Sequence, residues 1–242
     1  MEAKRSLGQN FFVNKHLGEY IIDILKQNKC SNIVEIGPGR GFFTQQLLQN
    51  FSSVTAIEKD SELASSLKQQ YSKLNIINKD FLDINLDNVI NKETVFFGSL
   101  PFNVAKPIVR KIIESKYFTI PSFFIVQKEV ADKYIYKEPY STLSLTTAIY
   151  SNCKKLLDIS PESFRPRPRV NSSLISFIPN SINIPDRQEI EGLITLSFRQ
   201  PRKNMSNNLK GTKYIKGLNE YKTMRPQQLS LNDYIQIYKY SL

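Results

Sequence analysis

Short apolar runs alternate with amphipathic stretches through the first two thirds of this 242-residue chain. The runs have the length and the β-branched or aromatic content of buried strands, and the stretches between them carry apolar residues at helical spacing. We expect strands at 33–36, 54–58, 74–80, 94–97 and 123–126, and helices at 15–28, 41–50, 61–71 and 105–115. Strands that alternate with helices form a mostly parallel sheet.

The later part of the chain changes character. The apolar segments 156–160 and 174–178 flank a proline-rich connection, which predicts an antiparallel pair at one edge of the sheet. A polar linker begins near residue 180, and short helices are expected at 190–198, 205–209 and 232–240. The predicted fold is therefore α/β, Rossmann-like, with a mostly parallel sheet and an antiparallel edge, in a domain at 1–179. A small basic helical domain is expected at 180–242.

Local chemistry also marks two helix starts. Asn14 is the expected N-cap of the first helix, because its side chain can accept from a free backbone N–H. Pro107 is expected in the first turn of the helix at 105–115, where its missing N–H costs nothing.

A glycine-rich loop follows the first predicted strand. The segment Glu35–Gly41 reads E-I-G-P-G-R-G and leads into a helix, a context in which glycines let a ligand approach the backbone closely. Glu58 ends the next strand, where a carboxylate suits a ribose diol, and Asp80 with Phe81 ends the third, a pair that suits an adenine ring. An ordinary strand–helix turn would explain the loop alone. Acids at three successive strand ends favour a nucleotide-like cofactor.

A second candidate segment, Gly98–Asn103, follows the fourth strand. The Ser99 hydroxyl and the Pro101 carbonyl could accept the two hydrogens of an adenine N6 amine, which would direct its lone pair toward a methyl donor. Phe102 could stack on the base. Alone, the tetrapeptide that begins at Ser99 is better explained as a strand that ends in a proline turn. Its expected place at the carboxyl edge of the sheet favours the catalytic interpretation.

Charge indicates a polyanionic partner. The chain has 33 Lys and Arg against 22 Asp and Glu, a net charge of +11. Such an excess favours phosphate contacts, although a generally basic proteome would also produce it. Two cationic clusters are candidates for RNA contact: Arg165, Arg167 and Arg169 in a proline-rich loop after Phe164, and Arg199, Arg202 and Lys203 near the C-terminus. The alternatives are a solvated loop with Phe164 in the core, and a solvated helix face.

Other classes find little support. Cys30 and Cys153 are too few for a disulfide scaffold and lack metal-ligand spacing, and His16 has no partner histidine, so we expect no metal. The sequence contains no membrane-spanning run and no signal-peptide core, which favours a cytoplasmic protein.

The motifs together resemble the rRNA adenine N6-dimethyltransferase family. The resemblance runs in order from about residue 4 to the C-terminus, through the segments 7–12, 35–41, 58–60, 98–103, 127–131, 163–172 and 198–203. It implies a class I methyltransferase fold, S-adenosyl-L-methionine as cofactor, and N6-methylation of adenine, once or twice, in rRNA. The segments 127–131 and 198–203 are similar to the small-subunit branch, which acts in ribosome biogenesis.

The resemblance also implies a set of site residues. Those expected at the cofactor are Gln9, Asn10, Phe12, Glu35, Gly37, Gly39, Glu58, Lys59, Asp80, Phe81 and Ser99. Those expected at the target adenine are Ser99, Leu100, Pro101, Phe102 and Phe164, the last as a second stacking ring. The family usually has Asn and Tyr where this chain has Ser99 and Phe102.

The expected partner is rRNA in a ribosomal subunit precursor, bound by a monomer. Three alternatives stay open. The chain could methylate large-subunit rRNA, as erythromycin-resistance enzymes do, or be an RNA-binding assembly or transcription factor with weak catalysis. A DNA adenine methyltransferase is less favoured, because the sequence has no separate target-recognition domain.

Overall fold

The computed structural model describes residues 9–90, 92–182 and 184–242. The chain forms two compact units. The first contains the described residues up to Asp132 together with Lys154–Pro179, and the second contains Lys133–Cys153 and Asn180–Leu242. The sequence predicts a division at 179/180, whereas the segment 133–153 groups with the residues after 179. No helix within these described ranges is both long and apolar enough to cross a membrane.

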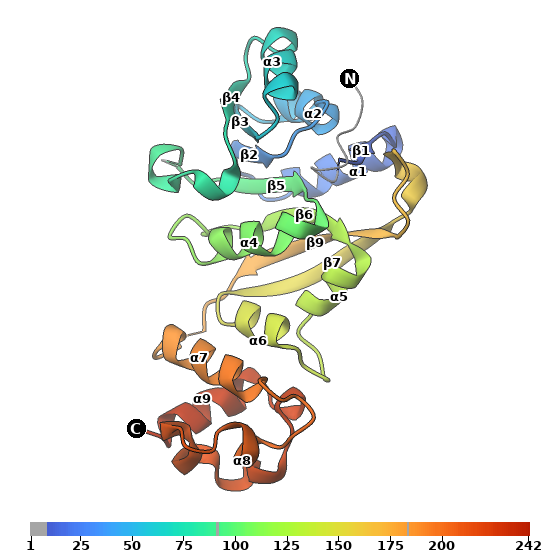
Figure 1. The fold of residues 1–242 in the computed structure, drawn as a ribbon. Helices are drawn as coiled ribbons and strands as arrows, with labels where there is room; N and C mark the ends of the chain where they lie inside the picture. The colour runs from blue at the N-terminus through green and yellow to red at the C-terminus, as the bar shows by residue number, and fades with distance from the viewer. Residues whose placement is uncertain (1–8, 91, 183) are drawn as a thin grey trace. The chain divides into compact units, whose positions relative to one another are not determined.

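The first unit is built on a seven-stranded sheet in the order β4-β3-β2-β5-β6-β9-β7 (Figure 1). Strands β2 to β6 are mutually parallel, and β9 pairs antiparallel with β6, so the expected α/β fold with an antiparallel edge is confirmed. The strands are β2 (Asn32–Ile36), β3 (Ser53–Glu58), β4 (Asn75–Asn78), β5 (Val95–Ser99), β6 (Ser122–Gln127), β7 (Ser151–Ile159) and β9 (Ser172–Pro179).

Helices cover the sheet because its strands are apolar on both faces. Alternate residues such as Ile33 and Phe97 join a buried cluster with residues of the helices that precede and follow β2, while Val34 and Phe96 point to the opposite face. The helices of this unit are α1 (Lys15–Lys26), α2 (Phe42–Asn50), α3 (Ser61–Gln70), α4 (Phe102–Ile113) and α5 (Lys128–Tyr134), which ends at the border of the unit.

Register brings the expected site segments to one edge of the sheet. Ile36 of β2 lies opposite Gly98 of β5, and Glu58 of β3 lies opposite Asn78 of β4. Because these strands are parallel, their carboxyl ends meet at a single edge, at the point where the strand order reverses. The glycine loop and Ser99 therefore follow adjacent strands at the same level.

Two local expectations at helix starts have different outcomes. Asn14 is the N-cap of α1, as expected, and its side chain accepts from the backbone N–H of Leu17 at 3.1 Å. Helix α4 begins at Phe102, three residues earlier than expected, which moves Pro107 out of the first turn. The expectation was wrong because the Pro101 carbonyl accepts the first hydrogen bonds of the helix. Pro107 therefore lies inside α4, where it has no N–H to donate to the Asn103 carbonyl.

Several short elements of the structure were not expected from the sequence. A two-stranded sheet joins β1 (Phe11–Phe12) to β8 (Phe164–Arg165), which follows a 3-10 turn, η4 (Pro161–Ser163). One-turn 3-10 helices, η2 (Phe81–Asp83) and η3 (Leu86–Asn88), lie between β4 and β5. Each is too short for a hydrophobic period to reveal it.

The second unit is helical. Its core is a cluster of buried apolar residues to which α6 (Thr142–Ala148), α7 (Arg187–Ser197) and α9 (Leu231–Lys239) contribute. The expected short helices near the C-terminus are present, and they are joined by 3-10 segments. The remaining elements are α8 (Met205–Asn208), η5 (Lys213–Thr223) and η6 (Pro226–Gln228).

Candidate functional site

A cleft of about 480 Å³ opens at the carboxyl edge of the sheet in the first unit. Its volume falls in the range of small-molecule sites. Every residue that was expected at the cofactor or at the target adenine lines this cleft. These residues are Gln9, Asn10, Phe12, Glu35, Gly37, Gly39, Glu58, Lys59, Asp80, Phe81, Ser99, Leu100, Pro101, Phe102 and Phe164.

The glycine loop presents its backbone to the cleft. Gly37 and Gly39 have φ angles of +67° and +60°, in the left-handed region that residues with a Cβ atom rarely adopt. A Cβ atom on Gly37 would meet no atom within 4 Å, so it would project into open space. A Cβ on Gly39 would lie 3.1 Å from the Phe11 ring. The loop is thus shaped for close approach by a ligand.

Glu58 holds this loop as well as facing the cleft. Its Oε2 accepts from the backbone N–H of Gly39 at 3.0 Å, and its Oε1 accepts from that of Asp60 at 2.9 Å. Burial raises the pKa of the Glu58 carboxyl above its ordinary value, against the lowering effect of these hydrogen bonds. A carboxylate retains further lone pairs, so Glu58 can still accept from a ligand.

Glu35 lies behind the loop. It is only 2 % exposed, and its Oε2 accepts a 2.6 Å hydrogen bond from the Thr44 hydroxyl of α2. Burial raises the pKa of Glu35 to about 8, so the group is mostly protonated at neutral pH. The side chain therefore ties β2 to α2 and offers little surface to a ligand.

Asp80 and Phe81 line the cleft just after β4. The Asp80 carboxylate accepts from the Lys59 ammonium at 2.8 Å and from the backbone N–H of Leu82 at 2.9 Å. The hydrogen bond from Lys59 is the main cause that lowers the pKa of Asp80. Asp80 is thus an ionised acceptor at neutral pH, next to the buried ring of Phe81.

Ser99 ends β5, and the three residues after it turn into α4. The Leu100 N–H donates to the Ile125 carbonyl at 2.9 Å, which fixes the turn against β6. The Pro101 carbonyl was expected to accept from a target amine. It accepts instead from the N–H groups of Val104 and Ala105, at 3.2 and 3.0 Å, because it starts α4. Phe102 is 55 % exposed, so its ring is available to a ligand.

Phe164 occupies a different environment. It is 3 % exposed and packs edge-on against Phe12, with ring centroids 5.2 Å apart. Phe12 also contacts Phe42 and Phe43, so both expected cleft residues belong to an aromatic cluster in the core. The alternative of a core position for Phe164 therefore describes this structure, although the ring also borders the cleft.

The two cationic clusters lie outside the cleft lining. Arg165 donates to the carbonyls of Glu162 and Phe164, and Arg167 forms an ion pair of 2.5 Å with the Glu162 carboxylate. Arg169 is exposed. Two of the three arginines are therefore already engaged by their own loop.

In the second unit, Arg199, Arg202 and Lys203 are exposed, and no ion pair with another described residue engages them. The loop that carries them is fixed by Asn208. Its side chain accepts from the Gln200 N–H at 3.1 Å and donates to the carbonyls of Gln200 and Lys203. A rigid turn thus displays three cations to solvent.

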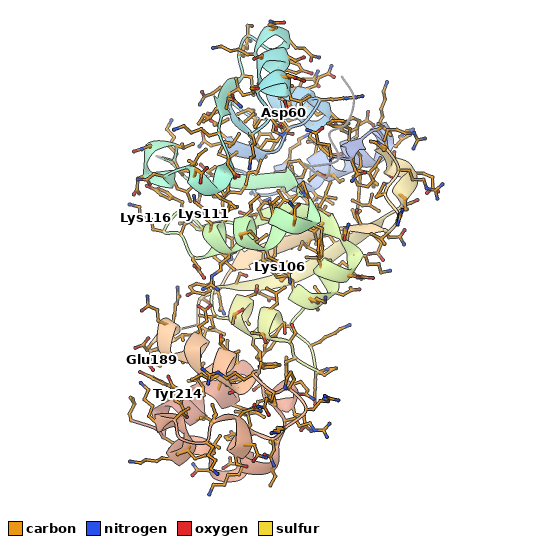
Figure 2. All side chains as sticks on the ribbon, viewed as in Figure 1. Asp60, Lys106, Lys111, Lys116, Glu189 and Tyr214 are labelled. Atoms are coloured by element: carbon orange, nitrogen blue, oxygen red, sulfur yellow. The ribbon has the colours of Figure 1, made fainter. Side chains whose placement is uncertain are left out.

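Two further residues lie at or near the cleft and were not among the expected site residues. Lys111 of α4 reaches the backbone of η2 (Figure 2), and Arg40 of the glycine loop lies over the Phe11 ring at 4.3 Å from its centroid. Lys111 gave no signal in the sequence because it is one cation among several on an amphipathic helix. In the described ranges, no three or more His, Cys, Asp or Glu side chains are placed to hold a metal ion.

Comparison with known proteins identifies the family. The family model for ribosomal RNA adenine dimethylase matches residues 1–241. The chain belongs to this family of dimethylases. The expected family is therefore confirmed, and with it the methyltransferase class. Membership implies S-adenosylmethionine as the methyl donor.

The relatives of this dimethylase agree with the assignment. It is 32 % identical to "Ribosomal RNA small subunit methyltransferase A" of Mycoplasma capricolum, over 98 % of this chain and 97 % of that protein. It is 35 % identical to the protein of the same name from Malacoplasma penetrans, over 86 % and 78 %.

Solved structures share the fold of this dimethylase. A dimethyladenosine transferase from Plasmodium falciparum has a TM-score of 0.79 at 20 % identity, with 94 % of this chain and 95 % of that chain covered. The 23S rRNA methyltransferase ErmE has a TM-score of 0.74 at 20 % identity, with 95 % and 98 % covered.

The cleft of this dimethylase fits a nucleoside cofactor. Open space at Gly37, the acceptor Glu58 at the end of β3 and the Asp80–Phe81 pair at the end of β4 are the features that such a ligand requires. The residues expected at the cofactor and those expected at the target base line the same cavity.

Proposed function

We propose that this chain methylates the N6 amine of adenine in small-subunit ribosomal RNA, in one or two transfers, during ribosome maturation. One observation carries the proposal: the glycine loop, the acids after β3 and β4, and the segment Ser99–Phe102 all line one cleft in a ribosomal RNA adenine dimethylase. The names of the Mycoplasma and Malacoplasma relatives support the small subunit as the substrate.

On the cofactor side, the backbone at Gly37 and Gly39 would lie against S-adenosylmethionine, and Glu58 would accept from its ribose hydroxyls. Asp80 would accept from the adenine amino group, with the Phe81 ring against the base. When bound, this cofactor supplies an electrophilic methyl group. Glu35 would act indirectly, since its hydrogen bond with Thr44 supports the loop from behind.

On the substrate side, the Ser99 hydroxyl and the Leu100 carbonyl would accept the two hydrogens of the target amine. The Leu100 carbonyl replaces that of Pro101 in this role, because the Pro101 oxygen is engaged in α4. These acceptors would localise the nitrogen lone pair, which the adenine ring otherwise delocalises. Phe102 would stack on the base, and its exposed ring supports that role. Water can remove the proton from the cationic product amine.

RNA contact would come from both cationic clusters. The exposed Arg199, Arg202 and Lys203 are available to phosphates, whereas Arg167 must exchange its pairing with Glu162 for a phosphate. The net charge of +11 supports an anionic partner of large extent.

The test uses purified protein, labelled S-adenosylmethionine and separated ribosomal subunits from cells that lack this modification. We expect label in small-subunit rRNA, recovered as N6-methylated adenosine by mass spectrometry of the digested RNA. Label confined to large-subunit rRNA would replace the proposal with the resistance-type activity. Binding of RNA and cofactor without any label would replace it with a binding role.

A further inference from the structure

Lys111 donates to three backbone carbonyls in η2 and directly after it, and one of them belongs to the cleft-lining residue Phe81. Its Nζ donates to the carbonyls of Phe81 at 3.1 Å, Leu82 at 2.6 Å and Ile84 at 2.6 Å. The same Nζ lies 5.5 Å from the centroid of the Phe81 ring. The side chain is half-buried on α4, and the three bonds are partly shielded from solvent. Hydrogen bonds from an ammonium are stronger than those between neutral groups.

These bonds hold the 3-10 helix η2 at its end, and a second interaction holds its start. At its start, the Asp80 carboxylate accepts from the Leu82 N–H at 2.9 Å. At its end, the Leu82 and Ile84 carbonyls accept from the Lys111 ammonium, and the Phe81 carbonyl accepts from both this ammonium and the Ile84 N–H. Negative charge at a helix start and positive charge at its end both interact favourably with the partial charges of the helix ends. This single turn, which packs against α4, is thus held from both ends.

The same lysine connects the two halves of the cleft. Helix α4 begins at Phe102, directly after Ser99–Pro101, and Lys111 lies two turns further along it. The helix therefore carries the proposed base-stacking ring at one end and, near the other, the cation that holds Phe81.

We propose that Lys111 is a positioning residue of the methyl-transfer site, which sets where Asp80 and Phe81 meet the adenine ring of the cofactor. The inference rests on the proposed function, since it assigns Asp80 and Phe81 to the cofactor. Lys111 touches neither ligand in this scheme and acts through the backbone of η2. The specificity of the cleft for an amino-substituted purine would follow from the position that it imposes on Asp80.

The test compares Lys111→Met with Lys116→Met. Methionine keeps most of the length of the side chain but loses the ammonium, in both variants. Lys116 is the matched control, because it forms a 2.7 Å ion pair with Asp87 in the neighbouring turn η3 and leaves η2 untouched. Calorimetry measures the affinity of each variant for S-adenosylhomocysteine and for its hypoxanthine analogue, which lacks the amino group.

We expect wild type to prefer the adenine ligand, and Lys111→Met to bind it roughly tenfold more weakly, the loss of about one strong hydrogen bond. Its affinity for the hypoxanthine analogue should change much less, so that the preference between the two ligands narrows. Lys116→Met should keep both affinities. With labelled RNA, Lys111→Met should raise the KM for the cofactor while kcat at saturation stays near that of wild type.

Two results would overturn the inference. If Lys111→Met binds both ligands as wild type does, η2 does not need the lysine. If both ligands lose affinity equally in Lys111→Met, the lysine stabilises the cleft in general and does not set the position of Asp80. An equal loss in Lys116→Met would show that the effect is not specific to the lysine that holds η2. Wild type that fails to bind S-adenosylhomocysteine at all would instead remove the proposed function, so the two failures are distinguishable.

Discussion

Glu35 and Glu58 end or nearly end neighbouring strands, yet their carboxyl groups have different surroundings. Glu58 accepts from two backbone N–H groups and borders the cleft, whereas Glu35 is enclosed with the Thr44 hydroxyl as its partner. Burial without a cation raises the pKa of Glu35 to about 8. One acid thus remains an acceptor for a ligand, while the other behaves as a neutral part of the core.

The raised pKa of Glu35 makes stability depend on pH. Below about pH 4.5 the group is protonated in the folded and unfolded chains alike, so it has no effect. Between that pH and about 8, only the unfolded chain loses the proton, so the folded state loses stability as pH rises, by up to roughly 5 kcal/mol. Glu35→Gln should remove this dependence, because an amide oxygen can still accept from Thr44.

Urea unfolding at pH 5 and pH 8 checks this expectation. The difference in the free energy of unfolding, Glu35→Gln minus wild type, should be larger at pH 8 than at pH 5. An unchanged difference between the two proteins across this range would show that Glu35 ionises in the folded chain at an ordinary pKa.

Ser99 allows a second prediction at the same scale. If its hydroxyl accepts from the target amine, Ser99→Ala should slow single-turnover methylation by a few-fold to about tenfold, the worth of one neutral hydrogen bond. Affinities for cofactor and RNA should stay near those of wild type. Ser99→Asn restores the common family residue and should preserve or raise the rate, most visibly in the second transfer. Dimethyladenosine formed by Ser99→Ala at the parent rate would end the catalytic role of Ser99.

At the scale of the element, the loop between β2 and α2 offers a test of the cofactor site. Gly37 and Gly211 share a left-handed backbone, with φ of +67° and +77°, and neither would bring a new Cβ atom within 4 Å of another atom. Alanine at either position should cost about 1–2 kcal/mol of stability for the same backbone reason. Only Gly37 lines the cleft.

Gly37→Ala should therefore weaken S-adenosylhomocysteine binding by about tenfold or more, whereas Gly211→Ala should leave it unchanged. Calorimetry measures the ligand affinity of the two variants, and thermal unfolding measures their loss of stability. The two measurements separate an effect on binding from an effect on the backbone. Equal affinities in the two variants would mean that the ligand does not approach the backbone at Gly37.

The elements differ in how far the sequence predicts them. The strands around Glu35 and Glu58 and the cap at Asn14 were predictable, because hydrophobic period and capping chemistry are local. The start of α4 at Phe102 was not, because Pro107 suggested a later start and tertiary packing outweighed that preference. The pairing of Phe11–Phe12 with Phe164–Arg165 joins segments far apart in the chain, and two-residue strands leave no period to detect.

The candidate site shows the same division. Glu58, Asp80 and Ser99 were found from strand ends, since parallel strands deliver their carboxyl ends to one edge, whereas Gln9 and Asn10 came only from the family resemblance. The surroundings of the individual side chains could not be predicted, because Glu35 and Phe164 are buried by contacts that only the folded chain makes. The bonds from Lys111 to η2 depend on the rotation of α4, which the sequence does not specify.

At the scale of the whole molecule, charge governs the encounter with RNA. Arg167 is paired with Glu162 in the free protein, and a phosphate must compete with that carboxylate. Glu162→Gln should free the arginine, so that RNA binding tightens at low salt and its logarithmic salt dependence steepens by up to about 0.9 per added duplex phosphate contact. Glu93→Gln is the control, because it removes an equal charge from an exposed position that holds no arginine.

Filter binding at several salt concentrations measures both variants. Equal gains for Glu162→Gln and Glu93→Gln would mean that only net charge matters and that the proline-rich loop does not contact RNA.

The order of the strands also bears on how the chain is made. During synthesis β7 emerges well before β9, yet in the finished sheet β9 lies between β6 and β7. Until Ser172–Pro179 has left the ribosome, β6 pairs with β5 on one side only, and its buried residues, such as Phe124 and Val126, have no strand on the side that β9 later occupies. An unpaired apolar edge is a template for aggregation. The nascent protein is therefore most vulnerable in the interval between the two strands, when β7 has been made and has nothing to join.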